Sequence, residues 1–246
     1  MRIDRLLCEL NIGSRTEAKR LLKSGQILVN GVRITKPEER VDENTAVILF
    51  KGKEYRYRRF VYFMMNKPAG FISATRDDSC KTVLDLFAQQ YALLYGNGLF
   101  GIPAGEIFPA GRLDKDSTGL LLLTNDGALA HALLSPKKHV PKTYYVETDL
   151  SLSGEKLLRL ENGVDIGEER PTQKARIERI TGQSCTITIT EGKFHQVKRM
   201  FQAVDLKVTY LKRLSIGSLR LDPGLAEGGI RELTKEEVSQ LCQKRY

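Results

Sequence analysis

The hydrophobic positions of the first 25 residues repeat at helical spacing. The segment DRLLCELNIG predicts a short helix with Asp4 as its N-cap and its leucines facing inward. The segment SRTEAKRLLKSG predicts a second helix, because Ser14 and Glu17 have the spacing of a capping box and Gly25 can end the helix. Two short helices joined by a tight connection are therefore expected at the N-terminus.

The pattern then changes from helical to extended in QILVNGVRI, where β-branched residues stand on both sides of Asn30-Gly31. An Asn-Gly pair between such runs predicts a two-residue β-hairpin. The polar segment KGKEYRYRR, residues 51–59, has no apolar period, and we interpret it as a linker.

Longer apolar runs after residue 60 predict strands that alternate with helices. Strands are expected at residues 61–66, 120–124, 142–150 and 184–192. Helices are expected in TVLDLFAQQY, in ALAHALL behind a cap at Asp126, and around QVKRMFQAV, whose apolar residues are helix-spaced. Because strands and helices are mixed without a regular βαβ repeat, the pattern predicts an α+β domain.

The charge is strongly positive and unevenly distributed. The chain carries a formal net charge of +9 at pH 7. Residues 1–60 hold 14 Lys and Arg against 8 Asp and Glu, a net charge of +6. Such an excess attracts polyanions such as nucleic acid.

Within the second predicted helix the cations form a row. Arg15, Lys19 and Lys23 follow one another at four-residue spacing, with Arg20 beside them. Like charges in one row repel unless something anionic faces them, although a solvated helix face is the common alternative.

Several common chemistries lack their sequence signals. The cysteines are far apart and form no CxxC pair, so neither a zinc site nor a disulfide framework is indicated. His131, His139 and His195 stand in separate segments, which argues against a shared metal. GNGLFG, residues 96–101, has no strand before it and no helix after it, so we expect a surface loop rather than a dinucleotide site. No phosphate-binding GxxxxGK[ST] motif is present, which excludes ATP hydrolysis of that type.

We expect a protein without metal or cofactor, without membrane association, and located in the cytoplasm. No apolar run approaches the ~20 residues of a membrane span. The first residues, MRIDRLLCELNIGSR, have acidic and polar residues where a signal peptide needs an apolar core.

The segment GRLDKDSTGLLLLTNDG, residues 111–127, contains the candidate chemistry. Asp114 stands between Arg112 and Lys115, in a predicted loop that leads into a buried strand. An Asp among cations is usually a surface ion pair of little energetic weight. Held rigidly beside a core strand, it can instead be a nucleophile or a base.

Two resemblances resolve these alternatives. Residues 1–48, with RLL…GSRTEAKRLLKSGQILVNG, resemble the S4 RNA-binding domain. Behind them GRLDKDSTGLLLLTNDG, KTYYV and EGKFHQVKRMF, in that order, resemble the RsuA-type ribosomal RNA pseudouridine synthases. NKPAGFISA and LKRLSIGSLRLDPGLAEGGIRELTKEE also fit, so the resemblance spans essentially the whole chain.

The resemblance implies two domains. Residues 1–58 would be a small α/β S4 RNA-binding domain with its linker. Residues 59–246 would be an α+β pseudouridine synthase domain with a mixed, largely antiparallel sheet. The RNA-facing cations of the first domain would be Arg15, Lys19, Arg20 and Lys23.

The resemblance also implies roles for the site residues. Asp114 would be the catalytic aspartate, and Tyr144 would stack on the target base and assist proton transfer. Lys198 would pair with Asp114 and keep the carboxylate ionised at neutral pH. Tyr145 could take the place of Tyr144, and Arg199 could exchange roles with Lys198.

The remaining residues of these motifs receive simpler roles. Arg112 and Arg199 are expected to contact RNA phosphates. Phe194 and Met200 are expected in the core.

The implied function is isomerisation of one uridine to pseudouridine in 16S ribosomal RNA. EGKFHQVKRM favours this small-subunit branch, although Asp205-Leu206 stands where the family usually turns on a glycine. The alternatives are a synthase acting on 23S rRNA and a non-catalytic S4-type rRNA-binding assembly factor. The expected partner is small-subunit rRNA or a pre-ribosomal particle, bound by a monomer. Three routes stay open for Asp114: attack on C1′, addition to C6, or abstraction of the 2′-proton.

Overall fold

The structure is a computed structural model that describes residues 1–95 and 107–243. Its contacts divide the chain into two compact units. The first comprises residues 1–61 together with residues 87–107, and the second comprises residues 62–86 and 108–246. The predicted GNGLFG loop at residues 96–101 lies outside the described residues.

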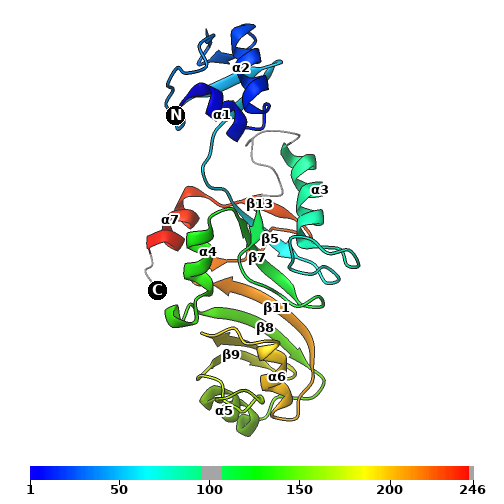
Figure 1. Cartoon of the computed structure of the whole chain (residues 1–246). Helices are drawn as coiled ribbons and strands as arrows, with labels where there is room; N and C mark the ends of the chain where they lie inside the picture. The colour runs from blue at the N-terminus through cyan, green and yellow to red at the C-terminus, as the bar shows by residue number, and fades with distance from the viewer. Residues whose placement is uncertain (96–106, 244–246) are drawn as a thin grey trace. The chain divides into compact units, whose positions relative to one another are not determined.

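The N-terminal part of the first unit contains two helices packed on a small antiparallel sheet (Figure 1). The strand order is β2-β1-β3-β4. The elements are α1 (Ile3–Glu9), α2 (Arg15–Lys23), β1 (Leu28–Val29), β2 (Val32–Arg33), β3 (Val47–Phe50) and β4 (Lys53–Arg56).

Both predicted helices are present, and one of their caps differs from expectation. Helix α2 has the complete capping box, in which Ser14 and Glu17 exchange side-chain to backbone hydrogen bonds. Helix α1 begins two residues earlier than expected, with Arg2 as its N-cap, so the prediction of Asp4 as cap is wrong. Asp4 is buried in the first turn, where its carboxylate accepts hydrogen bonds from the Arg2 guanidinium.

The Asn-Gly hairpin is confirmed, and the linker prediction for residues 51–59 is partly wrong. Asn30 and Gly31 both have positive φ, at 50° and 80°, as a two-residue hairpin turn with this twist requires. Residues 53–56 form strand β4, which pairs antiparallel with β3. The strand escaped prediction because it is a charged strand at the edge of the sheet, where Lys and Arg discourage pairing with another chain.

The second unit is built on a mixed sheet. Its elements include β5 (Tyr62–Lys67), β6 (Phe108–Pro109), β7 (Thr118–Thr124), α4 (Gly127–Leu134), a 3₁₀ turn (Pro136–Lys138), β8 (Lys142–Thr148), α5 (Gly154–Asn162), β9 (Arg176–Thr181), β10 (Ser184–Ile189), α6 (Gln196–Gln202), β11 (Val208–Ile216), β12 (Leu219–Arg220), β13 (Ile230–Glu232) and α7 (Lys235–Gln243). Helix α3 (Val83–Tyr95) begins in this unit.

Among the described residues the sheet has nine strands, with the main order β13-β5-β7-β11-β8-β10-β9 (Figure 1). β6 pairs with β7 and β12 pairs with β11. Every pairing is antiparallel except that of β7 with β11. The predicted mixed, largely antiparallel sheet is therefore confirmed.

Strand β7 explains the four-leucine run of the sequence. All seven of its residues are buried, and it lies between β5 and β11 inside the sheet. Leu120 and Leu122 belong to one hydrophobic cluster, which α4 and α7 also enter. A second cluster joins α5 and α6 to β8, β10 and β11. The loop that carries Asp114 is thus attached to a strand that cannot easily move.

Helix α6 has the predicted buried face and an unusual end. Its apolar residues are buried as their spacing predicts, at Val197, Met200, Phe201 and Val204. Asp205 follows the helix with φ of +55°, which is the left-handed backbone that glycine adopts most easily. This position is where the resembling family usually has glycine, so the structure keeps the turn with a different residue. None of the helices in the described part of the chain has the length and apolar character needed to cross a membrane.

Candidate active site

The loop between β6 and β7 holds Asp114 in a fixed place. Ser117 N donates a hydrogen bond to Asp114 O at 3.1 Å, which closes a turn directly before β7. Leu113, the residue before Asp114, is held by Ser73: Ser73 Oγ accepts from Leu113 N at 3.0 Å and donates to Leu113 O at 2.9 Å. The Asp114 side chain is one quarter exposed, so a rigid loop presents its carboxylate to solvent.

Lys67 supports the same loop from inside and was missed by sequence reasoning. Its side chain is fully buried at the end of β5. Its Nζ lies within hydrogen-bond distance of four main-chain carbonyl oxygens, those of Pro68, Asp114, Lys115 and Ser117, at 2.8–3.4 Å. A lysine ending the strongly apolar run VYFMMNK was the signal available, because a buried lysine needs such partners.

Burial lowers the pKa of Lys67 to about 8, although the negative charges of Asp114 and Asp116 oppose this shift. The folded chain therefore releases this proton near pH 8, whereas the unfolded chain keeps it until about pH 10.5. Because the unfolded state then binds more protons, stability rises with pH between these values, by up to roughly 3 kcal/mol.

We therefore expect the unfolding free energy of wild type, minus that of Lys67→Met, to increase from pH 7.5 to pH 10. Denaturant unfolding of both proteins at the two pH values measures it, and subtraction cancels groups common to both. Lys235→Met, at an exposed lysine of α7, should show a constant difference. A constant difference for Lys67→Met as well would contradict the lowered pKa.

The Asp114 carboxylate meets two side chains from the start of α6. Lys198 Nζ lies 3.0 Å from Asp114 Oδ2, and His195 Nε2 lies 3.4 Å from Oδ1. Sequence reasoning paired Lys198 with Asp114 and set His195 aside. The histidine is detectable only when α6 and the loop before β7 are brought together.

Lys198 is shared between two carboxylates. Its Nζ also lies 2.5 Å from Asp116 Oδ1. Partial burial opposes its charge, but the hydrogen bonds that Lys198 donates to Asp116 and Asp114 outweigh this and raise the pKa of Lys198. The hydrogen bond from Lys198 in turn lowers the pKa of Asp116. Lys198 is therefore held as a cation against the site.

The structure separates the two adjacent tyrosines of β8. Tyr144 is 8% exposed and belongs to the same hydrophobic cluster as Leu113 and Val197, the neighbours in sequence of Asp114 and Lys198. Tyr145 lies on the other face of the sheet, where its hydroxyl donates to Glu147 and its ring meets the edge of Tyr210. Of the two tyrosines, it is therefore Tyr144 that packs with the sequence neighbours of the Asp114–Lys198 pair.

Lys198 and Arg199 have different partners: Lys198 pairs with Asp114, whereas Arg199 pairs with Glu168. Arg199 Nη1 donates to Glu168 Oε1 at 2.6 Å and to Phe194 O at 3.1 Å, and Nη2 donates to Ile166 O. Arg199 thus ties the start of α6 to residues 166–168. Its side chain is partly exposed, and RNA contact by Arg199 stays a prediction. Arg112 is exposed, two residues before Asp114.

Of the two residues expected in the core, one is placed correctly. Met200 is fully buried. Phe194 is 68% exposed, so the prediction for this residue is wrong. It precedes α6, in a loop where helical periodicity does not apply.

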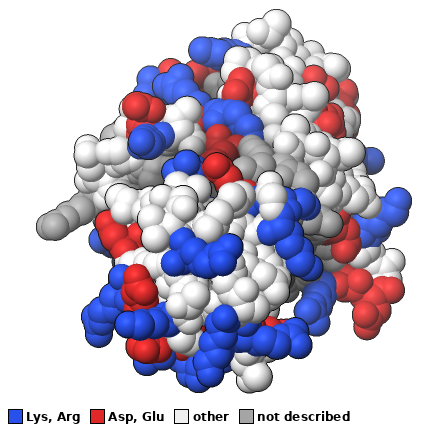
Figure 2. All heavy atoms as spheres, turned by 90° about the horizontal axis from the view of Figure 1, so that it is seen from above, with Lys and Arg blue, Asp and Glu red and all other residues white. Residues whose placement is uncertain are grey.

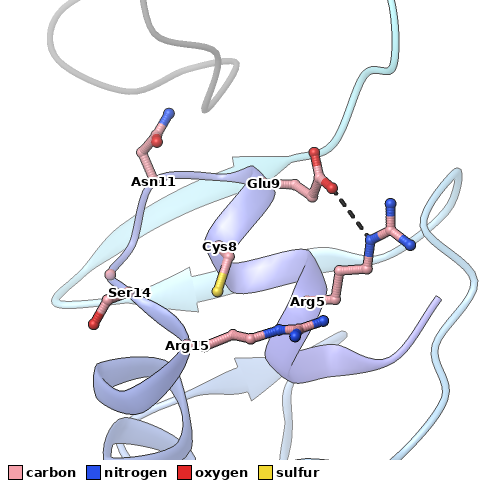
Figure 3. Close-up of a pocket in the computed structure, with 7 residues that line it drawn as sticks. Arg5, Cys8, Glu9, Asn11, Ser14 and Arg15 are labelled. Carbon is pink, nitrogen blue, oxygen red and sulfur yellow. Dashed lines mark hydrogen bonds and ion pairs between the residues drawn. The ribbon is translucent and has the colours of Figure 1, made fainter.

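The predicted RNA-facing cations line two open grooves in the N-terminal unit. One groove is lined by Lys19, Arg20 and Lys23 along α2. The other is lined by Arg15 together with the Arg5–Glu9 ion pair of α1, and Figure 3 shows Arg15 extending beside Cys8 towards Arg5. On the molecular face in Figure 2, Lys and Arg side chains form several groups interleaved with Asp and Glu. The grooves therefore offer localised cations to an anionic ligand.

The arrangement suits proton transfer or nucleophilic attack by a carboxylate. The Asp114 carboxylate is partly shielded from water and paired with Lys198, and Tyr144 belongs to the cluster formed by the sequence neighbours of this pair. Within residues 1–95 and 107–243, no three His, Cys, Asp or Glu side chains come together as a metal site would need.

Comparison with known proteins places this site in a family. The family model for RNA pseudouridylate synthase matches residues 61–203, and the model for the S4 domain matches residues 1–47. An uncharacterised RNA pseudouridine synthase of Bacillus subtilis is 47% identical over 98% of both chains. Ribosomal small subunit pseudouridine synthase A of Vibrio cholerae is 36% identical, covering 98% of this chain and 99% of that protein.

A solved structure agrees with these relatives. A crystal structure of a pseudouridylate synthase matches 98% of this chain and 99% of its own at 33% identity, with a TM-score of 0.66. The resemblance drawn from the sequence motifs is thereby confirmed. The chain belongs to the RNA pseudouridylate synthase family and carries an S4 domain ahead of its synthase region.

Proposed function

We propose that this enzyme converts one specific uridine of small-subunit ribosomal RNA to pseudouridine. The observation that carries the proposal is Asp114, presented on a loop held by Lys67 and paired with Lys198 at 3.0 Å. Full-length similarity to proteins named ribosomal small subunit pseudouridine synthase A supports the choice of RNA.

The reaction rearranges bonds within one nucleotide. The C1′–N1 bond breaks, the uracil rotates, and C5 forms the new bond to C1′. C5 then loses its proton and N1 carries one, so no atom is gained or lost and no redox partner is needed. We propose Asp114 as the group that starts this exchange, by attack on C1′, addition to C6 or removal of the 2′-proton.

Tyr144 and Lys198 complete the proposed site. Tyr144 would stack on the target base and assist proton transfer, which its place in the cluster beside Leu113 supports. Lys198 would pair with the Asp114 carboxylate, which lies 3.0 Å away. A uridine in a helix is inaccessible to these groups, so the nucleotide would be flipped out of its stack into the site.

We further propose a division of labour along the chain. Residues 1–58 would bind RNA through α2, and residues 59–246 would perform the chemistry. The exposed Arg112 and the partly exposed Arg199 would contact phosphates near the target. The enzyme would act as a cytoplasmic monomer on rRNA or on a pre-ribosomal particle.

Pseudouridine mapping tests the function. Small- and large-subunit rRNA, free and in assembled subunits, would be incubated with the protein, treated with carbodiimide and read by primer extension. One new stop on small-subunit RNA is expected. A stop on large-subunit RNA would overturn the choice of RNA but keep the chemistry. No stop on any of the four substrates would leave the non-catalytic binding role.

The α2 cations should determine the salt dependence of RNA binding. Replacing Arg15, Lys19 and Lys23 by Gln should reduce the slope of log affinity against log salt by about 0.7–0.9 for each lost phosphate contact. Filter binding of rRNA between low and moderate salt measures this slope. The same charge removed from Lys51, Lys53 and Arg56, exposed in and around β4, should change the slope little. Equal slopes for both triple variants would contradict the assignment.

A further inference from the structure

An exposed aromatic ring lies against a histidine that reaches the proposed catalytic carboxylate. Phe194 is 68% exposed, in the loop that leads into α6. Single exposed hydrophobic side chains are common on protein surfaces, so exposure alone indicates nothing. Phe194 differs from such residues because its ring stacks on His195.

Phe194 is stacked on His195, which in turn reaches the site. The two ring centroids are 3.9 Å apart and the planes are inclined by 17°. His195 Nε2 lies 3.4 Å from Asp114 Oδ1. The three side chains therefore form a continuous series from the carboxylate to the surface, and the centroid spacing is close to the ~3.4 Å between stacked bases.

The loop that carries the two rings is held firmly. His195 has φ of +46° and ψ of +34°, a left-handed conformation that is unfavourable for a residue with a side chain. Arg199 Nη1 donates to Phe194 O at 3.1 Å and is itself paired with Glu168. Lys193 N donates to the side chain of Gln196 at 2.9 Å. These hydrogen bonds fix the backbone on both sides of His195, whose imidazole reaches Asp114.

We propose that the outer face of Phe194 stacks on a nucleobase that flanks the target uridine in the RNA. This inference rests on the proposed function and adds a positioning residue to it. His195 covers one face of the Phe194 ring, and the other is available for a base. A flanking base anchored there would hold the strand beside Asp114 while the target uridine turns into the site.

The chemistry of the pair favours a base over other ligands. Every base has a flat π-face, and aromatic side chains bind unpaired bases by stacking without reading their identity.

A unique fluorophore tests the contact directly. The chain contains no tryptophan, so Phe194→Trp introduces a single one at the proposed contact. Binding of a small-subunit rRNA transcript should quench its fluorescence strongly, because a stacked base quenches indole emission. Leu158→Trp, at a position of α5 that is 61% exposed, is the matched control and should be quenched little. Equal quenching of the two variants would overturn the proposal.

Kinetics give a second readout that a merely structural role would not move. Phe194→Ala should raise KM for the RNA by roughly 10- to 100-fold, the loss expected for one stacked base, with a smaller change in kcat. Phe194→Tyr should restore KM. The melting temperature of Phe194→Ala should match wild type, because most of the ring is exposed.

The outcomes distinguish this inference from the function it rests on. Unchanged KM in Phe194→Ala, with pseudouridine still formed, would overturn the inference alone. Absence of pseudouridine in every RNA with the wild-type protein would overturn the proposed function, and the Trp fluorescence would still decide whether Phe194 meets a base.

Discussion

Asp114→Asn is expected to abolish pseudouridine formation while leaving RNA affinity within about twofold of wild type. Asparagine keeps the shape of the side chain but has neither the negative charge nor the basic oxygen that each of the three routes requires. Loss of a group that transfers protons or forms a covalent bond reduces rates by about 10⁴-fold or more in the stronger cases. Single-turnover assays on the mapped RNA measure the rate, and filter binding measures the affinity.

Asp116→Asn is the matched control for this prediction. Asp116 is the second carboxylate on Lys198, at 2.5 Å, but its side chain is 75% exposed and its removal leaves Lys198 paired with Asp114. Its rate should stay within about tenfold of wild type, since exposed ion pairs carry little energy. Product formation by Asp114→Asn at a rate similar to Asp116→Asn would contradict a direct chemical role for Asp114.

Gly119→Ala is expected to lower the free energy of unfolding by roughly 3–5 kcal/mol. Gly119 stands near the start of β7, opposite Arg213 in the parallel pairing with β11. An added Cβ would lie 2.3 Å from Arg213 O and 2.7 Å from Arg213 N, which are main-chain atoms of a neighbouring strand. Its φ of +99° adds backbone strain for any residue with a side chain. Chemical denaturation of the purified variant measures the loss.

Gly127→Ala serves as control for the glycine prediction. An added Cβ at Gly127 meets no atom within 4 Å, and its φ is not positive. Because Gly127 begins helix α4, alanine there should change stability by less than about 1 kcal/mol, in the stabilising direction. If both glycine variants unfold at the same denaturant concentration as wild type, the close approach of β7 and β11 does not constrain residue 119.

Local patterns predicted a large part of the fold correctly. The capping box of Ser14 and Glu17, the Asn30-Gly31 turn and the cap at Asp126 are all present, because each depends on residues at most a few positions apart. The leucine run of β7 and the helical spacing of α6 were also sufficient, since burial of an apolar face follows directly from its period.

The errors have a common physical cause. Asp4, the expected cap, is held by the Arg2 guanidinium, and β4, which lies in the expected linker, pairs with β3. Phe194, expected in the core, stands exposed in a loop. In each case residue type alone does not determine whether a segment pairs, caps a helix or is buried.

The sequence determined the order of the motifs, and their resemblance to a known family implied the fold and the pairing of Asp114 with Lys198. Only the tertiary structure placed Lys67 beneath the loop of Asp114, brought His195 to its second oxygen and showed that Tyr144 shares a cluster with Leu113 and Val197. The physical reason is distance along the chain. Asp116 and Lys198 are 82 residues apart. A contact between them exists only once α6 has packed on the sheet that contains β7.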